Sequence, residues 1–125
     1  LSRLSQYSFG VINGYRYGNV FDDAVKNGIL KNIDQTNSAE SNIKKLVAGR
    51  FDFMMSNREQ ALFTIKKVGL SDAVRELKPE VQIIPSYLAF SKKRNLGTVR
   101  ERFDSELRKM KDDGTYERII SEYWK

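Results

Sequence analysis

The Asn-Gly pair at residues 13 and 14 poses the question on which the fold class depends. The chain there can form either a β-hairpin or a strand that is followed by a loop and a helix. Asn-Gly between apolar runs is the strongest short hairpin signal, since both residues accept the positive φ of a type I′ turn. Residues 19–28, however, carry a helix signature. Asn19 is a good N-cap, apolar residues recur at helical spacing, and a glycine follows the last of them. A return strand would need these same residues, so the strand at 8–13 is predicted to lead into a helix.

Strands and helices continue to alternate as far as residue 68. The apolar spacing and the helix-capping residues predict two more of each, at residues 29–34, 38–48, 50–55 and 57–68. Such alternation predicts an α/β fold with a largely parallel sheet. In these sheets ligands bind where strand carboxyl ends meet helix amino ends. Residues 14–18 and the Ser56-Asn57 pair both follow predicted strands, so we expect them at the same edge of the sheet.

The pattern changes after residue 80. Short strands are predicted at 81–85 and 87–91, followed by a long amphipathic helix at 96–113 and a final helix at 116–123. The long helix carries one continuous apolar stripe, made of Leu96, Val99, Phe103, Leu107 and Met110.

The composition excludes several kinds of chemistry. The 125 residues contain no Cys and no His, which removes thiol nucleophiles, Cys/His zinc sites, Ser-His-Asp triads and imidazole bases. An enzyme would have to rely on carboxylates, Lys or Tyr, which makes catalysis less expected, and we assign no catalytic residue, no metal and no cofactor. The net charge of +6 is dispersed among acidic and apolar positions, which favours a solvated basic surface over a nucleic-acid partner. No apolar run approaches the length of a membrane span.

Four segments, taken in order, resemble the family 3 extracellular solute-binding proteins: VINGYRYG, AGRFDFMMSN, YLAFSKK and MKDDGTYERIISEYW. These are periplasmic proteins best known for serving amino-acid ABC importers, and their type II periplasmic-binding-protein fold clamps a solute between two α/β lobes. The likeness covers nearly all of this chain but only the second half of the family's domain. It implies that residues 1–86 form lobe two. Residues 87–125 are then a return hinge strand, beginning at Tyr87, and C-terminal helices that pack on a lobe one absent from this chain.

The resemblance also implies a solute site. Gly14, Tyr15 and Arg16 match the family's Gly-Thr-Thr loop, whose backbone and hydroxyls hold the solute's carboxylate. Ser56 and Asn57 match the strand end where the family places an Asp that pairs with the solute's ammonium. Both hydroxyl residues of the loop are replaced here, and Asn57 carries no charge. Arg16 adds a forked cation suited to carboxylate or phosphate, so an anionic or less basic solute becomes plausible.

The resemblance implies a non-catalytic periplasmic protein that captures a small polar solute, amino-acid-like or anionic, for an ABC importer, with the importer's permease as its membrane partner. A ligand-sensing module of the same fold in a signalling protein is the alternative. A carboxylate-based enzyme of this fold ranks last, because no carboxylates converge on the expected edge.

Simpler roles remain open for several of these residues. Arg16 is as readily a solvated charge, and Asn57 is at least as readily a plain helix N-cap. Tyr17, next to the helix start, is interpreted as a surface-packing residue. Without lobe one, the apolar tail stripe would face water. We therefore expect the tail to fold back on its own lobe or to exchange with a second copy, and we favour a tail-exchanged homodimer.

Overall fold

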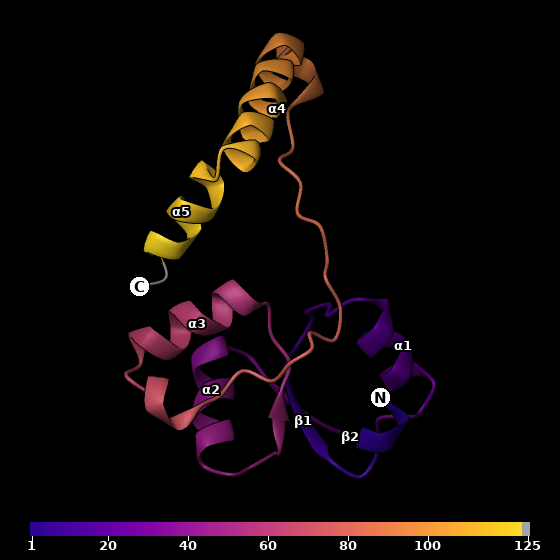
Figure 1. Ribbon diagram of the computed structural model, residues 1–125. Helices are drawn as coiled ribbons and strands as arrows, with labels where there is room; N and C mark the ends of the chain where they lie inside the picture. Colours follow the sequence, from indigo (N-terminus) through magenta and orange to yellow (C-terminus); the bar gives the residue numbers. More distant parts are fainter. Residues whose placement is uncertain (124–125) are drawn as a thin grey trace. The chain divides into compact units, whose positions relative to one another are not determined.

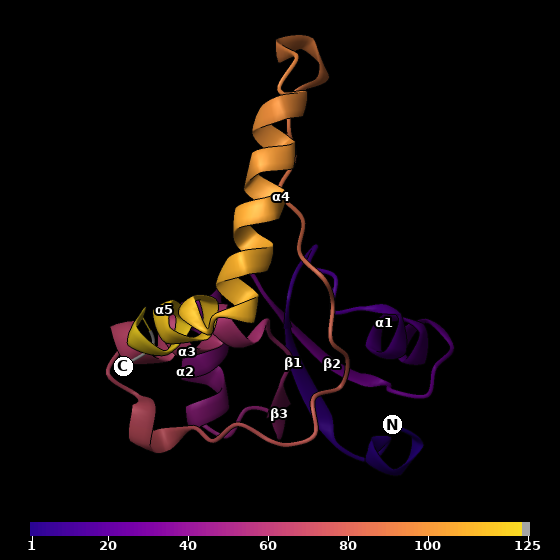
Figure 2. The same ribbon diagram turned by 45° about the horizontal axis from the view of Figure 1, so that its top comes forward.

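A parallel three-stranded sheet organises the first part of the chain in a computed structural model that describes residues 1–123 (Figures 1 and 2). The chain divides into two compact units, residues 1–84 and the part from Pro85 onward. The protein is therefore of mixed α/β class. The elements of the first unit are β1 (Ser8–Ile12), α1 (Asn19–Lys26), β2 (Asn32–Thr36), α2 (Ala39–Val47), β3 (Phe53–Met54) and α3 (Arg58–Lys67).

The strand order in the sheet is β2-β1-β3, and both pairings are parallel. The first strand is central: Ser8 to Ile12 pair in register with Asn32 to Thr36 on one side, and Phe9 and Gly10 pair with β3 on the other. The predicted parallel sheet is confirmed. The chain first adds β2 on one side of β1 and then crosses over to add β3 on the other side. The carboxyl ends of β1 and β3 therefore lie next to each other where the direction of strand addition reverses.

The core of the unit lies between β1 and α1. Phe9 and Val11 point from the strand to the face that α1 covers, where they meet Phe21, Ala24 and Leu30. The rings of Phe9 and Phe21 meet edge to face, with their centroids 5.7 Å apart. Burying such side chains contributes about 1.5–3 kcal/mol each, so this contact fixes the position of α1 and of the loop before it.

The opposite face of the sheet carries α2, and α3 packs on α2 (Figure 1). Ile43 of α2 is fully buried there. Gly10 has no side chain for a specific reason, because the Phe51 ring occupies the space that a β-carbon would need. The sheet thus has helices on both faces. The loops that follow β1 and β3 leave the sheet at its carboxyl edge.

The predicted N-cap at Asn57 is confirmed, and α2 carries an N-cap of the same kind, at Ser38, that was not predicted. Ser38 Oγ accepts the backbone N–H of Ser41 at 3.1 Å, and Asn57 Oδ1 accepts the N–H of Gln60 at 3.1 Å. The prediction for Asn19 is wrong. The cap of α1 is Gly18, whose φ of +92° favours glycine, and Asn19 is already the first helical residue.

All three strands differ from their predicted bounds, the first only in ending at Ile12 instead of Asn13. The second begins at Asn32 instead of Ile29, because the N–H groups of Ile29 and Leu30 both donate to the Ala24 carbonyl and close the end of α1. The third is restricted to Phe53–Met54, inside the predicted 50–55.

The strands predicted at 81–85 and 87–91, including the return hinge strand, are not formed in the described part of the chain. An extended segment becomes a strand only when another strand satisfies its backbone, and this one has no such neighbour. Tyr87 lies in this stretch with 87 % of its surface exposed.

The second unit contains a short 3-10 helix at Lys92–Arg94 and two α-helices, α4 (Gly97–Asp112) and α5 (Thr115–Tyr123). Both α-helices lie close to their predicted bounds. Asp113 Oδ1 accepts the Thr115 N–H at 2.8 Å and caps α5, and Gly114 turns the chain with a φ of +78°. Phe90 packs against Phe103 of α4 with ring centroids 6.3 Å apart. None of the side chains of residues 85–122 is buried.

Candidate functional site

The carboxyl ends of β1 and β3 bring together the two segments that the sequence singled out. Residues 13–18 follow β1, and residues 55–57 follow β3. The last rung between the strands is the Met55 N–H, which donates to the Gly10 carbonyl at 3.0 Å. Ser56 and Asn57 therefore begin directly beyond that rung, beside the loop that leaves β1.

The first part of the β1–α1 loop is open to solvent. Gly14 turns the chain with a φ of +77°, and nothing lies within 4 Å of the position that its β-carbon would occupy. Tyr15 is half exposed, and its N–H donates to the Ile12 carbonyl at 3.1 Å. The Arg16 side chain is 87 % exposed and lies 3.9 Å from Asp22, so it is held weakly and can reorient.

Tyr17 has a different position from the one predicted. It is half-buried against the core instead of lying on the surface, and its ring meets Phe21 edge to face at 5.7 Å. Its hydroxyl oxygen accepts the Ile12 N–H at 2.7 Å, and its own N–H donates to Asp22 Oδ1 at 3.2 Å. Burial raises the pKa of the Tyr17 hydroxyl, so the side chain is a neutral donor at neutral pH.

The amino end of α1 is already occupied by the chain itself. Gln82 Oε1 accepts the Val20 N–H at 3.0 Å. Gly18 makes this approach possible, because a β-carbon there would collide with the Gln82 carboxamide and would lie 3.0 Å from Ile84 Cδ1. The positive end of the α1 dipole therefore faces a neutral amide oxygen.

Asn57 uses only part of its hydrogen-bonding capacity within the described residues. Its Oδ1 is engaged in capping α3, while its side-chain NH₂ makes no hydrogen bond among residues 1–123. Ser56 is partly buried, and its hydroxyl makes no side-chain hydrogen bond within the same range. This edge of the sheet thus presents neutral hydrogen-bonding groups beside one mobile cation.

Two hollows mark the surface of the first unit. One, of about 610 Å³, lies beside the start of α1 and is lined by Arg16, Gly18, Asn19, Asp22, Asp23, Val25, Lys26 and Ile84. It contains two of the residues flanking Tyr17, and its lining carries two cations and two carboxylates.

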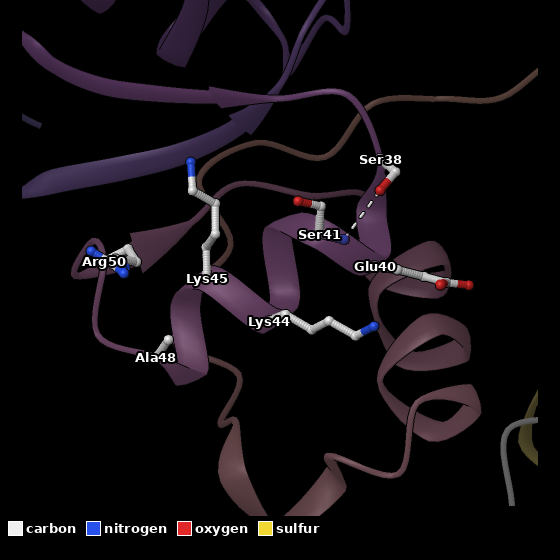
Figure 3. A pocket seen from close by; sticks show the side chains of 7 residues that line it. All are labelled: Ser38, Glu40, Ser41, Lys44, Lys45, Ala48 and Arg50. Carbon is white, nitrogen blue, oxygen red and sulfur yellow. Dashed lines mark hydrogen bonds between the residues drawn. The ribbon is translucent and has the colours of Figure 1, made fainter.

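The other hollow, of about 410 Å³, follows α2 and is drawn in Figure 3. Lys45 reaches from the helix toward the strands, where its ammonium pairs with Asp34. Glu40 at its rim pairs with Lys67 of α3 at 2.6 Å. This hollow was not predicted from the sequence, in which the adjacent Lys44 and Lys45 were the only visible signal. Of its four charged side chains, Glu40 and Lys45 are held in these ion pairs, whereas Lys44 and Arg50 form none within residues 1–123.

The carboxyl groups of Asp52, Glu76 and Glu80 have lowered pKa values because they form hydrogen bonds within the fold. Hydrogen bonds from the backbone and hydroxyl of Ser8 hold the pKa of Asp52 below its ordinary value, and Lys78 does the same for the pKa values of Glu76 and Glu80. Within residues 1–123 no cluster of three or more Asp and Glu side chains could hold a metal ion. No helix in that range is long and apolar enough to cross a membrane.

Comparison of the chain with models of known protein families, with curated protein sequences and with solved structures finds no match.

Proposed function

We propose that residues 1–84 are the solute-binding lobe of a two-lobed protein of the family 3 extracellular solute-binding type. One observation carries the proposal: the Gly14–Arg16 loop and the Ser56-Asn57 pair follow neighbouring parallel strands at the reversal point of the sheet. Open α/β sheets bind ligands at such points, where two loops diverge and leave a crevice. The resemblance of four sequence segments to this family leads to the same pair of loops as the solute site.

The chemistry of this edge favours a solute with an anionic group. Arg16 offers a guanidinium whose fork matches a carboxylate, and its exposure lets it swing toward a ligand. Asn57 offers NH₂ donors and no negative charge with which to neutralise an ammonium. An organic acid, or an amino acid whose carboxylate dominates its recognition, is therefore the solute class that we propose.

The remaining parts of the proposal rest on the resemblance. A protein of this type is periplasmic, delivers its solute to the permease of an ABC importer and catalyses no reaction. Its second lobe covers the solute from the other side. A single lobe makes only part of the contacts, so residues 1–125 should bind such a solute weakly.

A thermal-shift panel on the purified chain tests the proposal. The panel contains succinate, acetate, L-glutamate, L-alanine, putrescine and phosphate at millimolar concentrations. A solute at ten times its dissociation constant stabilises the folded state by about 1.4 kcal/mol, which moves the melting temperature by several degrees. We expect at least one carboxylate to do so.

Two variants locate the binding. Arg16→Ala should weaken the effect of the active carboxylate by about 1–3 kcal/mol in binding free energy, the usual range for a hydrogen bond to a charged group. Lys44→Ala, in the hollow along α2, should leave it unchanged. If no panel member stabilises the chain, or if only Lys44→Ala abolishes the effect, the sheet edge is not the solute site.

A further inference from the structure

The backbone of β1 leaves one N–H pointing into the space beyond the end of β3. Within a strand successive residues face opposite neighbours, and the Asn13 N–H donates to Thr36 of β2 at 2.7 Å. Ile12 therefore faces the β3 side, as does Gly10, whose carbonyl accepts the Met55 N–H. A longer β3 would pair with the Ile12 N–H, but β3 ends at Met54.

The Tyr17 hydroxyl occupies that place. Its oxygen accepts the Ile12 N–H at 2.7 Å, which puts the phenol tip in the gap between the two strand ends. The edge-to-face contact with Phe21 and the packing on the core hold the ring, so little side-chain entropy remains to be lost when the hydroxyl binds something.

The hydroxyl has an unused donor. It accepts one hydrogen bond from Ile12, and its own proton is hydrogen-bonded to no acceptor within residues 1–123. Because burial raises its pKa, the proton stays in place at neutral pH. A fixed O–H donor beside a mobile guanidinium suits an acceptor oxygen that carries negative charge.

We infer that the Tyr17 hydroxyl is a solute-binding donor, contacting a carboxylate oxygen in the gap between the carboxyl ends of β1 and β3. This inference rests on the proposed function and adds a residue to it. In this arrangement the Ile12 N–H orients the phenol oxygen, the phenol donates to the solute, and Arg16 supplies the compensating charge.

The test compares Tyr17→Phe with the unaltered chain in calorimetric titrations with succinate and L-glutamate. The Phe side chain keeps the ring that packs on Phe21 and removes only the hydroxyl. We expect the dissociation constant of the binding carboxylate to rise about tenfold. Tyr7→Phe is the matched control, because Tyr7 precedes β1 at the opposite end of the strand, where its ring packs on Phe53. This control should not change the constant.

A second measurement needs no substitution. The NMR signal of the phenolic ζ carbon of Tyr17 in the unaltered chain should shift on addition of succinate, whereas that of Tyr7 should not. This readout remains decisive if Tyr17→Phe, which leaves the Ile12 N–H without its partner, folds poorly.

The outcomes separate the two proposals. If succinate or L-glutamate still perturbs the Gly14 and Asn57 amides while the Tyr17 carbon stays unmoved and Tyr17→Phe binds equally well, Tyr17 is a structural residue. The proposed function then stands and this inference is wrong. If neither carboxylate perturbs those amides, the proposed function fails, and the inference fails with it.

Discussion

At the residue scale, the charge of the proposed site depends on position 57. Asn57 lies at the amino end of α3, caps it through Oδ1, and stands beside the gap between β1 and β3. Asp caps a helix as well as Asn does, so a substitution there changes the charge of the site without removing the cap.

Asn57→Asp should therefore raise the affinity for L-alanine and putrescine, whose ammonium groups gain a charged partner, and lower the affinity for succinate. Calorimetric titration of the three solutes measures both changes. Asn57→Ala provides the contrast, because it loses the cap at about 1 kcal/mol of stability and gains no charge. No change for any of the three solutes would mean that position 57 contacts no solute.

Asn42 of α2 differs from Asn57 in that its side chain is buried and forms no hydrogen bond within residues 1–123. It is only 1 % exposed, and neither its Oδ1 nor its Nδ2 has a hydrogen-bond partner within residues 1–123. A buried amide without partners costs folding free energy, and leucine fills a similar volume without that cost.

We predict that Asn42→Leu raises the free energy of unfolding in urea by about 1–3 kcal/mol. The exposed Asn37, changed to Leu in the same way, should move it by less than about 0.5 kcal/mol. A loss of stability in Asn42→Leu would show that the amide is satisfied by a buried water or another group.

At the element scale, hydrogen bonds between Ser8 and Asp52 at the amino end of the sheet hold β1 next to β3. The carboxylate of Asp52 accepts the Ser8 N–H at 2.8 Å and the Ser8 hydroxyl at 2.7 Å, and the Asp52 N–H donates to Ser8 Oγ at 3.1 Å. Because these bonds favour the ionised form, the pKa of Asp52 lies below its ordinary value of 3.8.

The lowered pKa gives a pH dependence of defined sign. Asp52 stabilises the fold fully above its unfolded-state pKa, and this contribution is lost as the pH falls through the lower, folded-state pKa. Asp52→Asn should thus be less stable than the unaltered chain at neutral pH, and the difference should disappear in strong acid. Asp104→Asn, on exposed α4, serves as the control in the same urea series. A difference independent of pH would show that ionisation of Asp52 is not what locks the strands.

The elements that local sequence determines were predictable, and those that depend on distant contacts were not. The Asn57 cap and both tail helices follow from residues close in sequence. The later start of β2 depends on how Leu30 packs at the end of α1. The predicted strands after residue 80 depend on pairing with another strand, and the sheet of the described residues contains only β1, β2 and β3.

The same distinction applies to the candidate site. The positions of the Gly14–Arg16 loop and of Asn57 beyond two parallel strands could be read from the alternation of elements. The contact of Tyr17 with Ile12 could not, because it depends on β3 ending early. Gln82 and Val20 are 62 residues apart, and no local pattern links them.

At the scale of the whole molecule, the unit from Pro85 onward raises the question of what covers its apolar side chains. Val99, Phe103 and Ile119 are each at least 40 % exposed, and no side chain among residues 85–122 is buried. Each large apolar side chain left in water forgoes about 1.5–3 kcal/mol. Exchange of this unit between two copies would bury them.

We predict that the chain sediments as a dimer at micromolar concentrations and that Phe103→Asp makes it a monomer. Arg102→Asp, one position away on α4, provides the control for introducing a carboxylate. Analytical ultracentrifugation measures all three. A monomer at every accessible concentration would contradict tail exchange.

Binding of a small anionic solute where β1 and β3 end is the proposal on which the others depend. An amide NMR titration of the full chain with succinate and L-glutamate tests it most directly, since it reports every backbone position at once. We predict saturable shifts concentrated at residues 13–18 and 55–57, with the signals of residues 38–50 along α2 unmoved. Shifts confined to α2, or no saturable shift with either solute, would contradict the proposal.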